Sequence, residues 1–126
     1  MLEGDFFHIR ALQTVDNTVK ATLELNGAHA ILKGHFPGQP VVPGACMMQM
    51  VKEITERVLG RETRLLKADQ VKFLAILTPA DSPPLLMELQ LTPGDNGETA
   101  VSAQLLHHST CCFKFKGLFA ASLSVL

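Results

Sequence analysis

The chain has 126 residues, of which 47% are hydrophobic, with 11 basic and 12 acidic side chains and a formal net charge of −1. This is the length of one domain, so we interpret residues 1–126 as a single domain. A nearly neutral chain has no overall charge that would attract nucleic acid or an anionic membrane, and the composition therefore argues against both as partners.

The N-terminus and the cysteines indicate a cytoplasmic protein. Residues 1–10 lack the basic start and the apolar stretch of a secretory signal, and no apolar run reaches the roughly 20 residues that a membrane helix needs. Cys46 stands alone, while Cys111 and Cys112 are adjacent and show no C-x-x-C spacing. Such a pattern is typical of reduced thiols.

The first part of the chain predicts a β-hairpin followed by a shaped loop. Residues 6–13 and 18–25 alternate between apolar and polar side chains around a turn at Asp16 and Asn17. The stretch 34–44 is rich in proline, which fixes φ and lacks an N–H donor, and in glycine, which frees the backbone. We expect no helix or strand in that stretch.

An amphipathic helix is predicted over residues 45–59, starting near Pro43 and ending at Gly60. The expected buried face consists of apolar residues at three-to-four-residue spacing, namely Met47, Met50, Val51, Ile54 and Val58. The opposite side is expected to face solvent and consists of Gln49, Glu53, Glu56 and Arg57.

Four further strands are expected after the helix. They cover residues 64–77, 85–91, 99–106 and 111–122, with a hairpin turn at 93–97. The order of two strands, one helix and four strands predicts an α+β domain in which an antiparallel sheet wraps around one central helix.

The segment GHFPGQPVVPG, residues 34–44, followed by a helix, resembles the β-hydroxyacyl-acyl-carrier-protein dehydratases of the FabZ/FabA type. Residues 69–73 and 79–81 also look similar to segments of that family. The resemblance implies a hotdog fold over residues 1–126. It also implies dehydration of a 3-hydroxyacyl thioester on acyl carrier protein to a trans-2-enoyl thioester, in fatty-acid or related polyketide or polyene synthesis, with no cofactor and no metal.

The same resemblance implies a catalytic base and a carbonyl clamp. His35 matches the histidine that removes a proton from C2 of the substrate, a role that suits an imidazole. The backbone at the helix start, near Gly44, matches the group that polarises the thioester carbonyl, where a helix N-terminus offers free N–H groups. The other expected substrate contacts are Phe36, Gly38, Pro43 and Met48.

Gln49 stands where the resemblance places an acidic residue. An amide can hold a water molecule or a hydroxyl but cannot donate and recover a proton. Glu53 lies one turn further, displaced by roughly 6 Å along the helix, and is a reserve acid in this interpretation. Alternatively, the two side chains lie on a solvated face or pair at (i, i+4) to support the helix.

Partners follow from the apolar composition and from the resemblance. We expect a homodimer or higher oligomer formed through the apolar helix and a sheet edge. Because the family builds each site from two subunits, a heteromeric hotdog partner with its own carboxylate is a further possibility. An acidic carrier protein fits the basic residues in and after the helix, Arg57, Arg61, Arg64, Lys67 and Lys72, although these equally suit a solvated surface.

Two other functions stay open. One is a non-catalytic acyl-thioester-binding subunit, which the substitution at Gln49 favours. The other is a hotdog thioesterase, in which Cys46 near the helix start is a candidate nucleophile and, more simply, a small buried residue. His107 and His108 are expected to point to opposite faces of a strand, so they predict no metal site.

Overall fold

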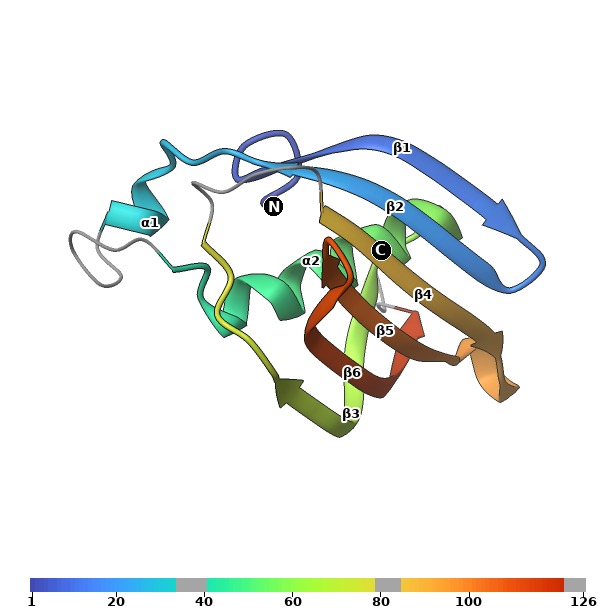
Figure 1. Ribbon diagram of the computed structural model, residues 1–126. Coiled ribbons are helices and arrows are strands. Elements are labelled where there is room, and N and C mark those ends of the chain that lie inside the picture. Colours follow the sequence, from blue (N-terminus) through green and yellow to red (C-terminus); the bar gives the residue numbers. More distant parts are fainter. Residues whose placement is uncertain (34–40, 79–84, 122–126) are drawn as a thin grey trace.

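The computed structural model describes residues 1–33, 41–78 and 85–121 (Figure 1). The strands are β1 (Phe7–Val15), β2 (Thr18–Leu25), β3 (Thr63–Phe73), β4 (Leu85–Pro93), β5 (Thr99–His107) and β6 (Thr110–Ala121). The helices are α1 (Ala30–Lys33), α2 (Gly44–Leu59) and the short 3-10 helix η2 (Asp95–Gly97).

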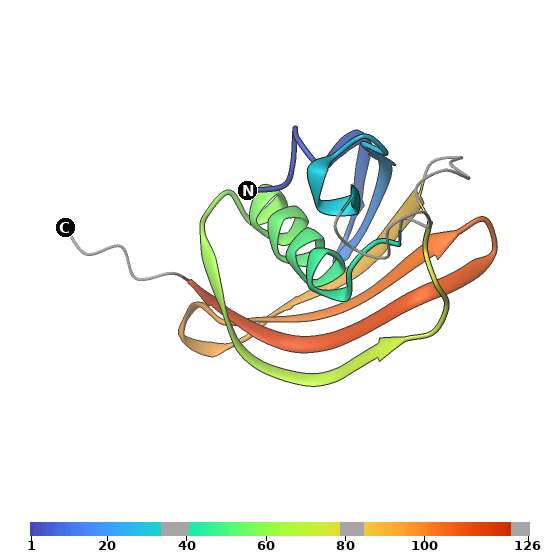
Figure 2. The same ribbon diagram turned by 90° about the vertical axis from the view of Figure 1, so that its left-hand side faces the viewer.

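All six strands form one antiparallel sheet in the order β1-β2-β4-β5-β6-β3. The sheet curves around α2, which lies along its concave face (Figure 2). Fully buried side chains of the helix, Met50 and Ile54, belong to the same hydrophobic cluster as Phe113 and Phe115 of β6. The expected arrangement of one sheet around one long helix is confirmed.

The hairpin turns lie where the sequence predicts them. Asp16 adopts a positive φ of 53° between β1 and β2, and Asn96 and Gly97 adopt φ values of 57° and 75° between β4 and β5. The helix ends at Gly60, whose φ of 71° is the left-handed conformation that a C-terminal glycine supplies.

The largest differences from the prediction are the end of β3 and the presence of α1. The strand expected over 64–77 ends at Phe73, because Leu74 and Ala75 both donate to the carbonyl oxygen of Cys112 (2.9 and 3.3 Å) and the regular pairing with β6 stops. The short helix α1 was not predicted, since four residues are too few to show a helical period. It starts after His29, whose Nδ1 accepts the N–H of Ile31 at 3.1 Å.

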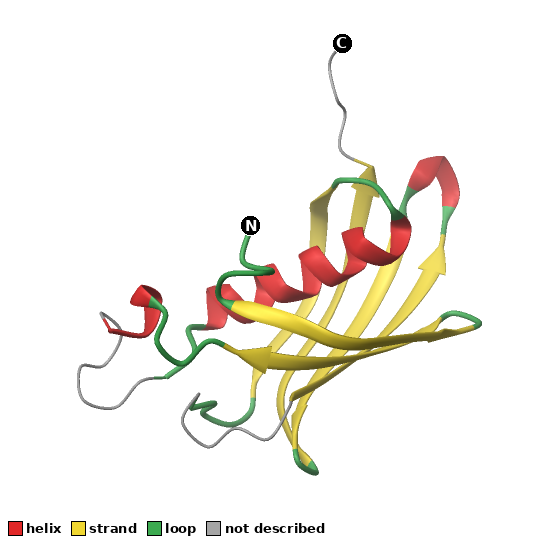
Figure 3. Cartoon of the chain, turned by 90° about the horizontal axis from the view of Figure 1, so that it is seen from above, coloured by secondary structure: helices red, strands yellow, loops and turns green. Residues whose placement is uncertain are grey.

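Two expectations about side-chain direction are wrong. Glu53 was expected in solvent but is only 3% exposed, because the N-terminal segment lies over this part of α2 (Figure 3). His107 and His108 were expected on opposite faces, yet their ring centroids are 4.7 Å apart. His108 has left the strand and adopts a φ of 55° in the turn that follows β5.

Replacing Gly117 by alanine is expected to destabilise the sheet, because a Cβ at this position would lie 2.5 Å from the carbonyl oxygen of Lys67 and 2.6 Å from Cζ of Phe115. Such overpacking costs about 1–3 kcal/mol, measurable as a lower midpoint of urea unfolding. The matched control is Gly94→Ala, where the nearest atom is 3.6 Å away. Equal losses in the two variants would contradict this account.

Candidate active site at the start of helix α2

The backbone at the start of α2 provides a positive electrostatic potential that favours a negative charge. Pro43 precedes the helix in an extended conformation (φ −63°, ψ 144°), and its carbonyl oxygen accepts the N–H groups of Cys46 and Met47 at 3.0 and 3.3 Å. The first turn contains no acidic side chain, so none neutralises the positive end of the helix dipole there. The role of the backbone near Gly44 as a carbonyl clamp stays a prediction.

The residue that approaches Gly44 most closely is Phe73 of β3. A Cβ added to Gly44 would lie 2.6 Å from Cε1 and Cζ of this ring. The Phe73 ring also packs on Phe113 with centroids 5.3 Å apart, yet the residue is 56% exposed. A larger residue at position 44 would therefore require the Phe73 ring to move, a contact that the sequence alone did not indicate.

An apolar pocket of about 240 Å³ opens beside this helix start. It is lined by Val41, Val42, Gly44, Met47, Phe73, Ala75, Ile76 and Leu77. Met47 lines the pocket, whereas Met48, the methionine expected to contact the substrate, is half-buried against the hydrophobic core. An apolar lining beside a helix N-terminus is a suitable environment for the thioester end of an acyl chain.

Further along α2, the carboxylate of Glu53 is buried and receives hydrogen bonds on both oxygens. Oε1 accepts the backbone N–H groups of Leu2 (2.9 Å) and Glu3 (2.8 Å), and Oε2 lies 2.7 Å from the nitrogen of Leu2. Arg57 also forms an ion pair with the side chain of Glu3. The carboxylate thus fixes the N-terminal segment on α2 (Figure 3).

Gln49 and Glu53 are brought together. Nε2 of Gln49 donates to Oε2 of Glu53 at 2.9 Å, so the (i, i+4) pair foreseen as an alternative is present. The residues expected to complete the site, His35, Phe36 and Gly38, lie outside the described residues. The role of His35 as the base and that of Gln49 as the hydroxyl binder stay predictions.

The thiol of Cys46 lies near the same helix start and is 8% exposed. Burial raises the pKa of this thiol, which disfavours the thiolate that a nucleophile requires. In residues 1–33, 41–78 and 85–121, no three His, Cys, Asp or Glu side chains gather closely enough to hold a metal ion.

The basic residues after α2 do not form one cluster. Arg57 is engaged with Glu3, and Arg61 donates to the carbonyl oxygen of Gly97 at 3.1 Å. Lys67 and Lys72 lie on β3, the edge strand of the sheet.

Two lysines that the sequence analysis missed stand beside those of β3. Lys114 of β6 is directly opposite Lys72, and Lys116 is opposite Gln70. Lys114 and Lys116 alternate with the buried Phe113 and Phe115, and this alternation was a usable signal. We name the four exposed lysines Lys67, Lys72, Lys114 and Lys116 the outer basic face.

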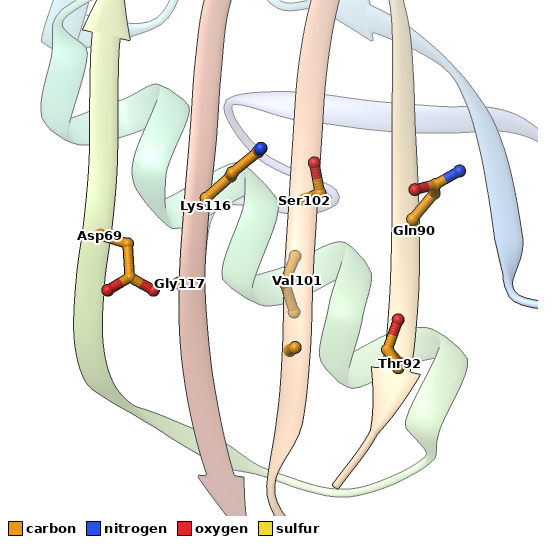
Figure 4. A pocket seen from close by; sticks show the side chains of 8 residues that line it. Asp69, Gln90, Thr92, Val101, Ser102, Lys116 and Gly117 are labelled. Carbon is orange, nitrogen blue, oxygen red and sulfur yellow. The ribbon is translucent and has the colours of Figure 1, made fainter.

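Figure 4 looks onto this side of the sheet, with α2 behind the strands. Asp69, Lys116, Ser102 and Gln90 follow one another across four strands (Figure 4) and line a shallow hollow of about 200 Å³. Asp69 pairs with Lys67 at 3.1 Å. Along β3 and β6, Asp69 is the one acidic side chain among these four lysines.

Comparison with known proteins extends these observations. Residues 11–115 match the family of ApeI-like proteins, described as ApeI dehydratase. The chain is 29% identical over 94 residues to a 3-hydroxyacyl-[acyl-carrier-protein] dehydratase FabZ of Syntrophomonas wolfei, covering 69% of this chain and 64% of the relative. It is 26% identical over 98 residues to the FabZ of Ralstonia nicotianae, covering 78% of this chain and 56% of that protein. The chain thus spans less than two thirds of these relatives.

Among solved structures, the chain is similar to the dehydratase heterocomplex ApeI:P from Xenorhabdus doucetiae. The TM-score is 0.71 at 18% identity, and the match covers 89% of this chain and 96% of that one. This likeness confirms the predicted hotdog fold. None of the helices described here is long and apolar enough to cross a membrane. With the family match extending over residues 11–115, the chain belongs to the ApeI-like dehydratase family and has a hotdog fold.

Proposed function

We propose that this protein takes part in dehydrating a 3-hydroxyacyl thioester, bound to acyl carrier protein, to a trans-2-enoyl thioester in fatty-acid or related polyketide or polyene synthesis. The main support is the dehydratase family match over residues 11–115, which includes the histidine loop and the whole of α2. The apolar pocket beside the start of α2 supports the same proposal. We propose a cytoplasmic location.

In this proposal His35 takes the proton from C2 of the substrate. The C2–C3 double bond forms as the C3–O bond breaks, and the hydroxyl leaves with a proton as water. The helix start at Gly44 holds the carbonyl oxygen as negative charge develops there. Gln49 holds the hydroxyl, and Phe36, Gly38, Pro43 and Met48 contact the substrate.

The proton that the leaving hydroxyl needs cannot come from Gln49, because an amide does not donate and recover protons near neutral pH. Glu53 does not replace it in the described arrangement, since both carboxylate oxygens are engaged by N–H donors. The proton therefore returns from His35 or comes from a carboxyl group of a second hotdog subunit. A protein solved as a dehydratase heterocomplex, with the same fold, makes the second route reasonable.

A non-catalytic acyl-thioester-binding subunit is the alternative that Gln49 favours. A thioesterase receives less support, because the raised pKa of Cys46 disfavours a thiol nucleophile. Release of free thiol from a model acyl thioester identifies a thioesterase, since a dehydratase leaves the thioester bond intact.

The proposal predicts that the purified protein hydrates crotonyl-pantetheine, the reverse reaction, seen as loss of enoyl absorbance. His35→Ala is expected to abolish this activity by removing the base. Gln49→Glu is expected to raise the rate by about 10²-fold or more, because a positioned acid is typically worth about 10²–10⁴ in rate.

The outcomes separate enzyme from binding subunit. Activity in the parent that disappears with His35→Ala supports a self-sufficient dehydratase. No activity in the parent, with activity in Gln49→Glu, supports a binding subunit or one that needs a partner. Inactivity of all variants, alone and with a co-purifying hotdog chain, would contradict the proposal.

We also propose that β3 is the edge through which a second hotdog chain docks. Exposed large apolar residues concentrate along this edge and its continuation: Leu65, Leu66, Val71, Phe73, Leu74 and Ile76. An edge strand presents unpaired backbone groups, and a partner strand would satisfy them while covering the apolar side chains. The partner is a second copy or a different hotdog subunit.

A double variant, Leu66→Lys with Val71→Lys, is expected to convert the assembly to monomers by placing charge in this interface. Light scattering coupled to size exclusion measures the mass. Val15→Lys is the matched control, because Val15 is 70% exposed on β1 at the other edge of the sheet. A parent that is monomeric and fully active would overturn the proposed assembly. Co-purification of a second hotdog chain that is lost in the double variant would favour the heteromer.

The outer basic face is the proposed docking surface for acyl carrier protein. Lys72 and Lys114 are directly opposite each other, an arrangement that destabilises a sheet pair unless a partner supplies negative charge. An acidic carrier protein supplies it, and complementary charge of this kind mainly raises the association rate.

Replacing Lys114 and Lys116 by glutamate is expected to raise KM for crotonyl carried on acyl carrier protein roughly 10-fold at low salt. The KM for crotonyl-pantetheine, which lacks the acidic carrier, is expected to stay unchanged. Lys20→Glu is the control, because Lys20 is an exposed lysine on β2, remote from β3 in strand order. An equal effect on both substrates, or an equal effect of the control, would contradict docking at this face.

A further inference from the structure

The contacts of Glu53 determine which end of the Gln49 amide is free. Glu53 is 3% exposed, and its two oxygens receive the backbone N–H groups of Leu2 and Glu3 together with Nε2 of Gln49. Both oxygens of Glu53 act as acceptors in these contacts, so the NH₂ end of Gln49, which is its donor end, faces them. The hydrogen-bond donors around Glu53 therefore assign the orientation of the Gln49 amide, whose oxygen and nitrogen are otherwise hard to tell apart.

The carbonyl oxygen of Gln49 consequently points away from Glu53. Gln49 is half-buried, and its Oε1 has no hydrogen-bond partner within the described residues. The helix thus presents a fixed acceptor one turn before a buried carboxylate. Because Glu53 is held by backbone N–H groups from the N-terminal segment, it cannot turn without breaking those bonds.

We propose that Glu53 is a positioning residue that holds the oxygen of Gln49 toward the ligand and thereby makes the site prefer a hydroxyl over a carbonyl at C3 of the acyl group. This inference rests on the proposed function, which places C3 of the substrate at Gln49. A 3-hydroxyl group donates a hydrogen bond to Oε1. A 3-oxo group offers only an acceptor, so the two oxygens are left unpaired, and an unpaired buried polar group weakens binding.

The substitution Glu53→Gln provides a distinctive test. The new amide has a single oxygen, which the N–H groups of Leu2 and Glu3 require, so its NH₂ end is left to face Gln49. Gln49 then turns to accept that hydrogen bond and presents its own NH₂ toward the ligand. The preference is therefore expected to reverse from hydroxyl to oxo, an effect that simple destabilisation of the helix would not produce.

The probes are 3-hydroxybutyryl- and 3-oxobutyryl-pantetheine analogues with an amide nitrogen in place of the thioester sulfur. Their dissociation constants are measured by titration calorimetry. The parent is expected to bind the hydroxyl analogue roughly 10-fold more tightly, in line with one lost hydrogen bond. Glu53→Gln is expected to invert this ratio, and Gln49→Leu to remove it.

Glu56→Gln is the matched control. Glu56 lies on the same helix and accepts the backbone N–H of Thr63 at 2.7 Å, together with Nζ of Lys52 at 2.9 Å, but it does not contact Gln49. This variant loses a carboxylate that, like Glu53, holds a distant backbone segment on α2. It is expected to keep the preference of the parent for the hydroxyl analogue. A changed preference in Glu56→Gln, or an unchanged one in Glu53→Gln, would overturn the inference.

The orientation itself is measured without a ligand. In the parent, NMR is expected to show a scalar coupling across the hydrogen bond between Nε2 of Gln49 and the carboxylate carbon of Glu53, and slower exchange of the Gln49 amide protons than of those of the exposed Gln104. If the coupling is present and neither analogue binds, the proposed function fails and the ligand preference with it. If the coupling is absent, the positioning role is overturned whatever the ligands do.

Discussion

The buried carboxylate of Glu53 is the contact on which the arrangement of this hotdog chain around its site depends. Burying a charge is costly unless donors surround it, and here the donors are two backbone N–H groups of the N-terminal segment and the amide of Gln49. One carboxylate thus joins three parts of the molecule: α2, the segment that leads into β1, and the side chain of Gln49. The ion pair between Arg57 and Glu3 strengthens the same junction.

The start of α2 and its middle part offer different chemical groups to a ligand. At its start, an uncompensated helix dipole and an apolar pocket suit the thioester end of a ligand. One to two turns later, Gln49 offers a hydrogen-bond acceptor but cannot donate a proton as an acid does. The neighbouring carboxylate of Glu53 is already hydrogen-bonded to the N-terminal segment and to Gln49. Under the proposed function, this division requires either a histidine that both removes and returns the proton or a second subunit that brings an acid. The exposed apolar residues along β3 form the edge that we propose for such a subunit.

Local patterns predicted most of the fold, and contacts between distant segments account for what they missed. Alternating side chains located the strands, and the period of α2 together with Gly60 located the helix. The burial of Glu53 was not predictable, because the donors that cover it lie about 50 positions away in the sequence. The same holds for Phe73 over Gly44, which β3 brings to the helix start. A helical pattern records which residues are polar, but not whether another segment supplies partners for them.

The most direct test is a crystal structure of the protein with the amide-linked 3-hydroxybutyryl-pantetheine analogue bound. The account predicts that the 3-hydroxyl donates to Oε1 of Gln49 at hydrogen-bond distance, that Nε2 of Gln49 stays on Glu53, and that the His35 ring faces C2. A ligand bound away from α2, or a Gln49 amide turned with its NH₂ toward the hydroxyl, would contradict it.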